Sequence, residues 1–231
     1  MRYDCSNFNA CFIFLTAKQY KAHFSMWAIV NSPLLMGNDL RTLSAESLTI
    51  LNNPAVVAIN QDPLAKSAIR IYRNTNVAKD EYGQGEAQIW SGKLFGGDRV
   101  VAFLNAANED VDMSASLKEI FIREAGKAPE VEEEWNVHDL WGNRMTEEDA
   151  QKILEGASTA TFQKLGWYNA TETSYEAGIR SGDVRLLGKF IGTVKPRGSL
   201  QAKVKRHSIE IFRLRNIKKS QATERLKHEE L

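Results

Sequence analysis

The sequence predicts an α+β chain in two parts, the end of an α/β unit followed by an antiparallel β-sandwich. Three observations support this prediction. Helical and strand-like patterns alternate over about the first 65 residues, short stretches bounded by turn residues follow from Ser67 onward, and a single helical pattern interrupts those stretches. The 231 residues suffice for one large domain or two small ones.

The first element is an amphipathic helix from about Ala17 to Val30. Its aromatic residues Tyr20, Phe24 and Trp27 recur at helical spacing. Pro33 stops this helix and begins the apolar run 33–37, which is typical of a strand buried on both faces of a parallel sheet.

A second helix is predicted after Ser44, which is a good N-cap, with Glu46 in the first turn. Leu48 and Leu51 point inward, and Asn52 to Pro54 end the helix. A second apolar stretch, 56–60, follows and is closed by Gln61, Asp62 and Pro63.

Short strands dominate the rest of the chain. Leu200, Ala202 and Val204 alternate with polar residues, as in a half-buried antiparallel strand. The expected strands are 87–90, 99–104, 111–115, 135–140, 192–195, 200–204 and 208–214. Thr146 caps the interrupting helix Glu147–Leu154, which Gly156 ends. Its expected inner face consists of Ala150, Ile153 and Leu154.

Composition excludes several functions. The net charge of +1 gives no field that favours nucleic acid or an acidic membrane, and no apolar run is long enough to cross a bilayer. The cysteines, Cys5 and Cys11, and four scattered histidines lack the spacing of a metal site. We therefore expect no metal, no nucleic acid and no membrane partner.

Three ordered stretches are more specific than composition: HFSMWAI with SPLLMGNDLR (23–41), VAINQDPL (57–64) and Asp139-Leu140-Trp141. Together they resemble the family 27 glycoside hydrolases, the α-galactosidase and α-N-acetylgalactosaminidase group. Residues 168–176 and the closing strands are most similar to the fungal α-galactosidases. The resemblance runs from about Gln19 to Arg215. One departure is Ala65, where the family usually has glycine.

This resemblance implies four regions. Residues 1–18 are a non-family N-terminal segment, and residues 19–66 are the last part of a (β/α)8 catalytic barrel with its eighth strand. Residues 67–216 are the C-terminal β-sandwich domain, and residues 217–231 are a charged tail. The abrupt loss of resemblance before Gln19 favours a misplaced start in the gene model over a genuinely truncated product.

The resemblance implies retaining hydrolysis of terminal α-D-galactosyl groups from oligosaccharides or polysaccharides such as galactomannans, with no cofactor. Two carboxylates about 5 Å apart carry out this chemistry. In the family both are aspartates on earlier barrel strands, so no residue of this chain inherits a catalytic or substrate-binding role. We expect the chain alone to be inactive and to expose apolar surface between residues 24 and 59.

Two alternatives remain open, a non-catalytic carbohydrate-binding or interaction module and a product without a role. Trp167, in a loop beside Gly166, is the candidate sugar platform, whereas Trp135 and Trp141 are expected in the core. Asp39 and Asp62 are expected to brace turns rather than to act in catalysis.

Asn169-Ala170-Thr171 is an N-glycosylation sequon, and Asn169 is the predicted glycan site. The family implies secretion or passage through the secretory pathway, and His228 to Leu231 resembles an endoplasmic-reticulum retention signal. The acidic residues between Glu130 and Glu134 are expected to form a solvated loop.

Overall fold

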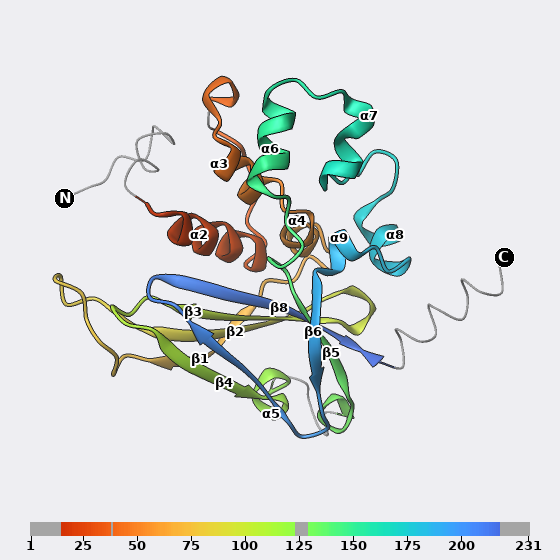
Figure 1. The fold of residues 1–231 in the computed structure, drawn as a ribbon. Coiled ribbons are helices and arrows are strands. Elements are labelled where there is room, and N and C mark those ends of the chain that lie inside the picture. Colours follow the sequence, from red (N-terminus) through yellow and green to blue (C-terminus); the bar gives the residue numbers. More distant parts are fainter. Residues whose placement is uncertain (1–14, 38, 123–128, 218–231) are drawn as a thin grey trace, which may run out of the picture.

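Most helices gather on one side of a large β-sheet in the computed structural model, which describes residues 15–37, 39–122 and 129–217 (Figure 1). The expected tail, 217–231, and the segment 1–18 lie mostly outside the described residues. None of the helices in the described ranges has the length and apolar character of a membrane span.

The first part of the chain is helical. It contains α2 (Ala17–Ile29), the 3-10 turn η1 (Leu40–Thr42), α3 (Ala45–Leu51) and α4 (Pro54–Asn60). A capping box between Thr16 and Gln19 starts α2, and Ser44 caps α3 as predicted. The apolar stretch 56–60 lies in α4, because the Asn53 side chain accepts from two N–H groups of its first turn.

The prediction of a strand at 33–37 is wrong, because these residues form neither a strand nor a helix in the structure. A parallel strand takes its hydrogen bonds from neighbouring strands, and the described residues place no strand beside this segment. Within the segment, the Leu35 N–H donates to the Pro33 carbonyl oxygen at 3.2 Å, which forms a local turn. Leu35 and Met36 are 79% and 56% exposed.

The second part is an antiparallel sandwich, as predicted. A six-stranded sheet has the order β1-β2-β3-β8-β5-β6, and β4 pairs with β7 in a second sheet. The strands are β1 (Ile69–Asn74), β2 (Ala87–Lys93), β3 (Arg99–Asn105), β4 (Val111–Ser116), β5 (Trp135–Asp139), β6 (Lys189–Val194), β7 (Ser199–Val204) and β8 (Ser208–Asn216). Sequence reasoning missed β1, although Ile69 and Ile71 alternate with Arg70 and Tyr72.

Two apolar cores sandwich the large sheet. One lies between the two sheets around Phe103, Trp135 and Leu214. The other lies between the large sheet and helices α2 and α4, around Ile29, Val56 and Ile211. The centre of the sheet is therefore buried on both faces. Helices α2, α3 and α4, which we call the barrel-end helices, are part of the same folded unit as the sandwich.

A helical insertion separates β5 from β6. It contains α6 (Glu147–Leu154), α7 (Thr159–Phe162), α8 (Tyr175–Arg180) and α9 (Val184–Leu187), and it packs on α3 and α4 (Figure 1). The predicted caps of α6 are confirmed, and Ala150 is buried, but Leu154 is exposed rather than inward. The last three helices are too short for a helical period to show in sequence.

Candidate functional site

An apolar groove of about 480 Å³ lies on the barrel-end helices. Its lining residues come from α2, the segment before α3, α3 itself and α4, with Tyr175 from α8. They are Tyr20, His23, Phe24, Trp27, Leu34, Leu35, Met36, Asp39, Thr42, Leu43, Ser44, Ser47, Ile50, Leu51, Asn52, Val57, Gln61 and Tyr175. Apolar surface was expected between residues 24 and 59, and the exposed residues Trp27, Leu35 and Met36 of that range line this groove.

Helix α2 is apolar on two sides. Ser25, Ala28 and Ile29 are buried against the sandwich and α4, whereas His23 and Trp27 line the groove and make an edge contact at 5.2 Å between ring centroids. Burial lowers the pKa of His23 below its usual value. A helix with two apolar sides is typical of a layer with neighbours on both sides.

Asp39 braces the turn at the rim of the groove, as predicted. Its carboxylate accepts from the backbone N–H of Arg41 at 3.0 Å and from the guanidinium Nε and Nη2 at 2.9 and 2.8 Å. These bonds hold the pKa of Asp39 below its usual value. A carboxylate with this partner is not poised to donate or accept a proton near neutral pH.

Asp62 also braces a turn, between the barrel-end helices and the sandwich. Its carboxylate accepts from the N–H of Leu64 and from the N–H of Phe95, both at 3.0 Å. Burial raises the pKa of Asp62 above its usual value, although the hydrogen bonds from Phe95 and Leu64 act in the opposite direction. Nothing in this environment pairs Asp62 with Asp39 in the manner of a glycosidase carboxylate pair.

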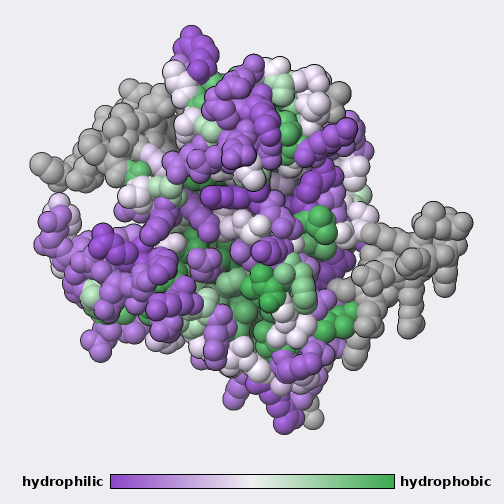
Figure 2. Space-filling view, viewed as in Figure 1, coloured by the Kyte–Doolittle hydropathy of each residue, from purple (hydrophilic) through white to green (hydrophobic). Residues whose placement is uncertain are grey.

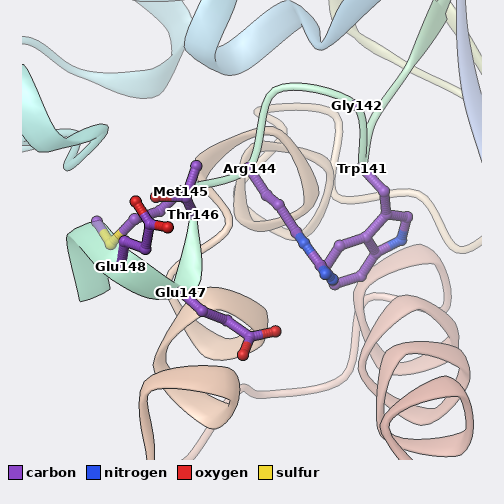
Figure 3. A pocket seen from close by; sticks show the side chains of 7 residues that line it. All are labelled: Trp141, Gly142, Arg144, Met145, Thr146, Glu147 and Glu148. Carbon is purple, nitrogen blue, oxygen red and sulfur yellow. The ribbon is translucent and has the colours of Figure 1, made fainter. Parts of the chain in front are cut away.

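A second hollow of about 490 Å³ lies beside Trp141 (Figure 3). Arg144 extends alongside the Trp141 indole, 5.9 Å from the ring centroid. Glu147 and Glu148 belong to the first turn of α6 and point in different directions (Figure 3). Two carboxylates that diverge cannot flank one glycosidic bond, so this hollow does not have the arrangement of a glycosidase centre.

Trp135 and Trp141 are buried in the two cores, as predicted. Trp167 is half-buried and packs against Met145 and Phe162, 5.5 Å between the Phe162 and Trp167 rings. This packing leaves only part of the Trp167 ring open for a sugar.

Asn169 lies in an exposed turn that Glu172 helps to hold. Its Oδ1 accepts from the backbone N–H and hydroxyl of Thr171 at 3.1 and 2.7 Å, and its Nδ2 donates to Glu172 Oε1 at 2.7 Å. The Thr171 contacts come from within the sequon itself.

The acidic segment before β5 forms a 3-10 turn with no buried residue at Pro129–Glu132, and two of its carboxylates make ion pairs. Glu132 pairs with Arg197 at 2.8 Å, and Glu134 pairs with Lys195, so both contact the turn between β6 and β7. No group of three or more possible metal ligands occurs among residues 15–37, 39–122 and 129–217.

Comparisons with known proteins agree with this architecture. The model described as the alpha galactosidase C-terminal beta sandwich domain matches residues 84–167, and the one described as Alpha galactosidase A matches residues 8–62. An α-galactosidase of Torulaspora delbrueckii is 45% identical over 201 residues, which are 87% of this chain and 42% of that protein. One from Saccharomyces mikatae is 43% identical over the same shares.

Solved structures give the same result. An α-galactosidase from Saccharomyces cerevisiae matches with a TM-score of 0.82 and 42% identity, over 87% of this chain and 44% of that one. A structure of an α-galactosidase from Saccharomyces cerevisiae with raffinose matches equally well. A Mortierella vinacea α-galactosidase, 21% identical with a TM-score of 0.55, shares the fold over 87% of this chain and 36% of its own.

The fold and these matches define a partial glycosidase barrel with its C-terminal β-sandwich. Over 87% of its length the chain is similar to α-galactosidases found in yeasts. It spans less than half the length of the relatives described above.

Proposed function

We propose that this chain forms the C-terminal part of a retaining α-galactosidase that removes terminal α-D-galactosyl groups from galactosides and galactomannans. The apolar groove carries this proposal, because it opens on the barrel-end helices rather than on the sandwich. Asp39 is the one carboxylate among the lining residues given above, and it is engaged in a turn with Arg41. Asp62, outside the groove lining, is engaged in a turn as well. The attacking and proton-donating carboxylates must therefore come from preceding barrel strands, and the chain by itself has no activity.

Hydrolysis of an aryl α-galactoside tests this proposal. The chain is assayed alone and as a single polypeptide in which it follows the part of the Saccharomyces cerevisiae enzyme that its match does not cover. We expect no release of the aryl alcohol by the chain alone and release by the joined polypeptide. A joined polypeptide that folds but lacks activity, or activity in the chain alone, contradicts the proposal.

Asn169 is the proposed glycan site, and the secretory pathway is the proposed compartment. The sequon turn is exposed around Thr171, and its Glu172 contact is a surface interaction that contributes little free energy. Expression through a yeast secretory pathway should give a chain whose mass falls on glycosidase treatment. Asn169→Gln and Thr171→Ala should both abolish that shift, while Asn143→Gln, outside any sequon, should keep it.

An interaction module is the second candidate function, and one surface favours it. Strand β6 is at the edge of the large sheet, and its residues Phe190 and Ile191 are exposed. Apolar side chains gather in the region of Figure 2 that corresponds to β6 in Figure 1. Titration with galactose and galactomannan, together with sizing chromatography, distinguishes this candidate. The interaction module would be supported if the chain bound sugar or associated with itself and if Phe190→Ser weakened that binding or association.

A further inference from the structure

We infer that the indole of Trp167 is a platform for the first sugar of a glycan on Asn169, an N-acetylglucosamine whose apolar face rests on the open part of the ring. This inference rests on the proposed glycan site but goes beyond it, since it assigns a side chain of the protein to hold the attached sugar. It also gives Trp167 a role that requires no free carbohydrate.

Trp167 and Asn169 lie two residues apart in the connection between α7 and α8 (Figure 1). Tyr168, between them, is buried among residues of α4, α8 and α9. The three residues form neither a helix nor a strand, and neighbouring side chains of an extended chain point to opposite sides. Trp167 and Asn169 therefore share the side away from the Tyr168 ring, and two residues of chain span at most about 7 Å.

Hydrogen bonds turn the Asn169 amide toward the segment on which Trp167 packs. Asn169 Nδ2, the atom that carries a glycan, donates to Glu172 Oε1 at 2.7 Å, and Glu172 Oε2 accepts from Gln163 Nε2 at 2.8 Å. Gln163 directly follows Phe162, whose ring centroid is 5.5 Å from that of Trp167. The amide nitrogen and the indole thus adjoin the same two residues, so a sugar attached at Nδ2 begins beside the indole.

The indole is held in place before any sugar is attached. The backbone N–H of Trp167 donates to the Phe162 carbonyl oxygen, and the Trp167 carbonyl accepts from Arg185 Nη1, both at 3.0 Å. The ring packs on Phe162 and on the cluster around Met145, yet it is only half-buried, which leaves part of it open. A platform that is already fixed loses little conformational entropy when a sugar rests on it.

The chemistry of the sugar matches this surface. One face of N-acetylglucosamine presents C–H groups, and an indole offers a large apolar area to such a face. Attachment replaces one hydrogen of Asn169 Nδ2 and leaves one N–H, which can still donate to Glu172. A free galactoside would lose its translational and rotational freedom on binding to the same ring. The covalent link removes most of that cost, so the glycan's own sugar is the favoured occupant.

A comparison of the chain with and without the sugar tests this contact. The chain is secreted from yeast and trimmed with an endoglycosidase that leaves one N-acetylglucosamine, and the bare chain of the same sequence is produced in the bacterial cytoplasm. We expect the sugar to lower the equilibrium constant for unfolding in urea by about two- to tenfold, the size of one aromatic contact. An unchanged or larger constant overturns the inference.

Variants of the ring distinguish stacking from a general effect of the glycan. Trp167→Leu should abolish the effect of the sugar on unfolding, and Trp167→Phe should keep part of it because an aromatic face remains. Trp90→Leu, at a half-buried tryptophan on β2, should keep the full effect. An equal effect of the sugar in the natural chain and in Trp167→Leu would contradict the platform.

Nuclear magnetic resonance detects the contact in the natural chain, without any variant that could fail to fold. The C–H resonances of the sugar face that rests on the indole should move upfield in the folded chain relative to the urea-unfolded chain, because the ring current shields them. Sugar resonances at the same positions in both states overturn the inference.

The outcomes separate this inference from the proposed glycan site. A secreted chain that carries no glycan on Asn169 contradicts the site and the platform together. A chain that carries the glycan, but shows neither the slower onset of unfolding with urea nor the upfield shift, keeps the site and overturns only the platform.

Discussion

Ser25 on α2 accepts a hydrogen bond from the indole N–H of Trp141, with 3.0 Å between Oγ and Nε1, and both side chains are buried. The bond joins the barrel-end helix to the turn that follows β5 of the sandwich, 116 residues later in the chain. A buried donor that loses its acceptor costs more than an average hydrogen bond contributes. This contact is therefore one reason why the two parts fold as one unit.

Replacing either partner should destabilise the chain. Ser25→Ala leaves the Trp141 N–H buried and unpaired, and the free energy of unfolding should fall by about 1 to 3 kcal/mol. Trp141→Phe should cost a similar amount, and the double variant should cost less than the sum. Urea unfolding of all four proteins measures this coupling, and additive losses would show that the bond does not link the two parts.

The buried ion pair between Asp98 and Arg213 should be sensitive to removal of one partner. Arg213 Nη1 donates to Asp98 Oδ2 at 3.0 Å, while its Nε and Nη2 have no hydrogen-bond partner among the described residues. Asp98→Ala leaves a buried charge and should lower the free energy of unfolding by about 3 to 5 kcal/mol. Denaturant unfolding checks this value.

Two further variants serve as controls for Asp98→Ala. Glu132→Ala removes the exposed pair with Arg197 and should cost less than about 1 kcal/mol. The double change Asp98→Leu with Arg213→Met should cost less than Asp98→Ala alone, because no unpaired charge remains. A double variant less stable than Asp98→Ala would show that the pair itself, and not the uncompensated charge, dominates.

Asp62 should make stability depend on pH in an unusual direction. Burial raises its pKa in the folded chain, so the folded state binds the proton more tightly than the unfolded state does. The stabilisation from this group is present at low pH and is lost as pH rises from about 4 through the folded pKa. Asp62→Asn removes this loss, so its stability relative to the natural chain should increase with pH.

Urea unfolding at several pH values measures that difference. Asp110→Asn is the control of opposite sign, since the hydrogen bond from Lys205 lowers the pKa of Asp110 and its stabilisation is lost as pH falls. The relative stability of that variant should therefore decrease with pH. Parallel trends for the two variants would refute the assignment for Asp62.

Sequence reasoning succeeded where the signal is local. The spacing of Tyr20, Phe24 and Trp27 and the alternation in β7 predicted elements that the structure contains. It failed at 33–37, because a parallel strand depends on neighbours that the local sequence does not contain. The Asp98–Arg213 pair joins residues 115 positions apart, so no local pattern could show it. The groove likewise depends on how five segments pack together.

Gly188 should tolerate substitution less well than Gly156. Both have positive φ, +86° and +96°, which costs an alanine about 1 to 2 kcal/mol. A Cβ at Gly188 would also lie 2.5 Å from the backbone oxygen of Asp139. A Cβ at Gly156 would have no heavy atom within 4 Å among the residues that the structure describes. Gly188→Ala should therefore cost about 1 to 3 kcal/mol more than Gly156→Ala. Equal thermal shifts would contradict the close approach of β5 and α9.

Ala65 is one position at which the chain departs from the family pattern, and its backbone conformation explains why glycine suits it. Its φ is +46°, and its N–H donates to Asp62 O at 2.9 Å in the turn that leads to the sandwich. Ala65→Gly should relieve the left-handed strain, partly offset by the greater freedom of glycine in the unfolded chain, for a net gain of about 0.5 to 1 kcal/mol. Ala170 is an exposed turn residue without positive φ, so Ala170→Gly should instead lower the free energy of unfolding by about 0.4 to 1 kcal/mol. Thermal unfolding distinguishes the two, and a loss of stability in Ala65→Gly would show that the turn is not strained.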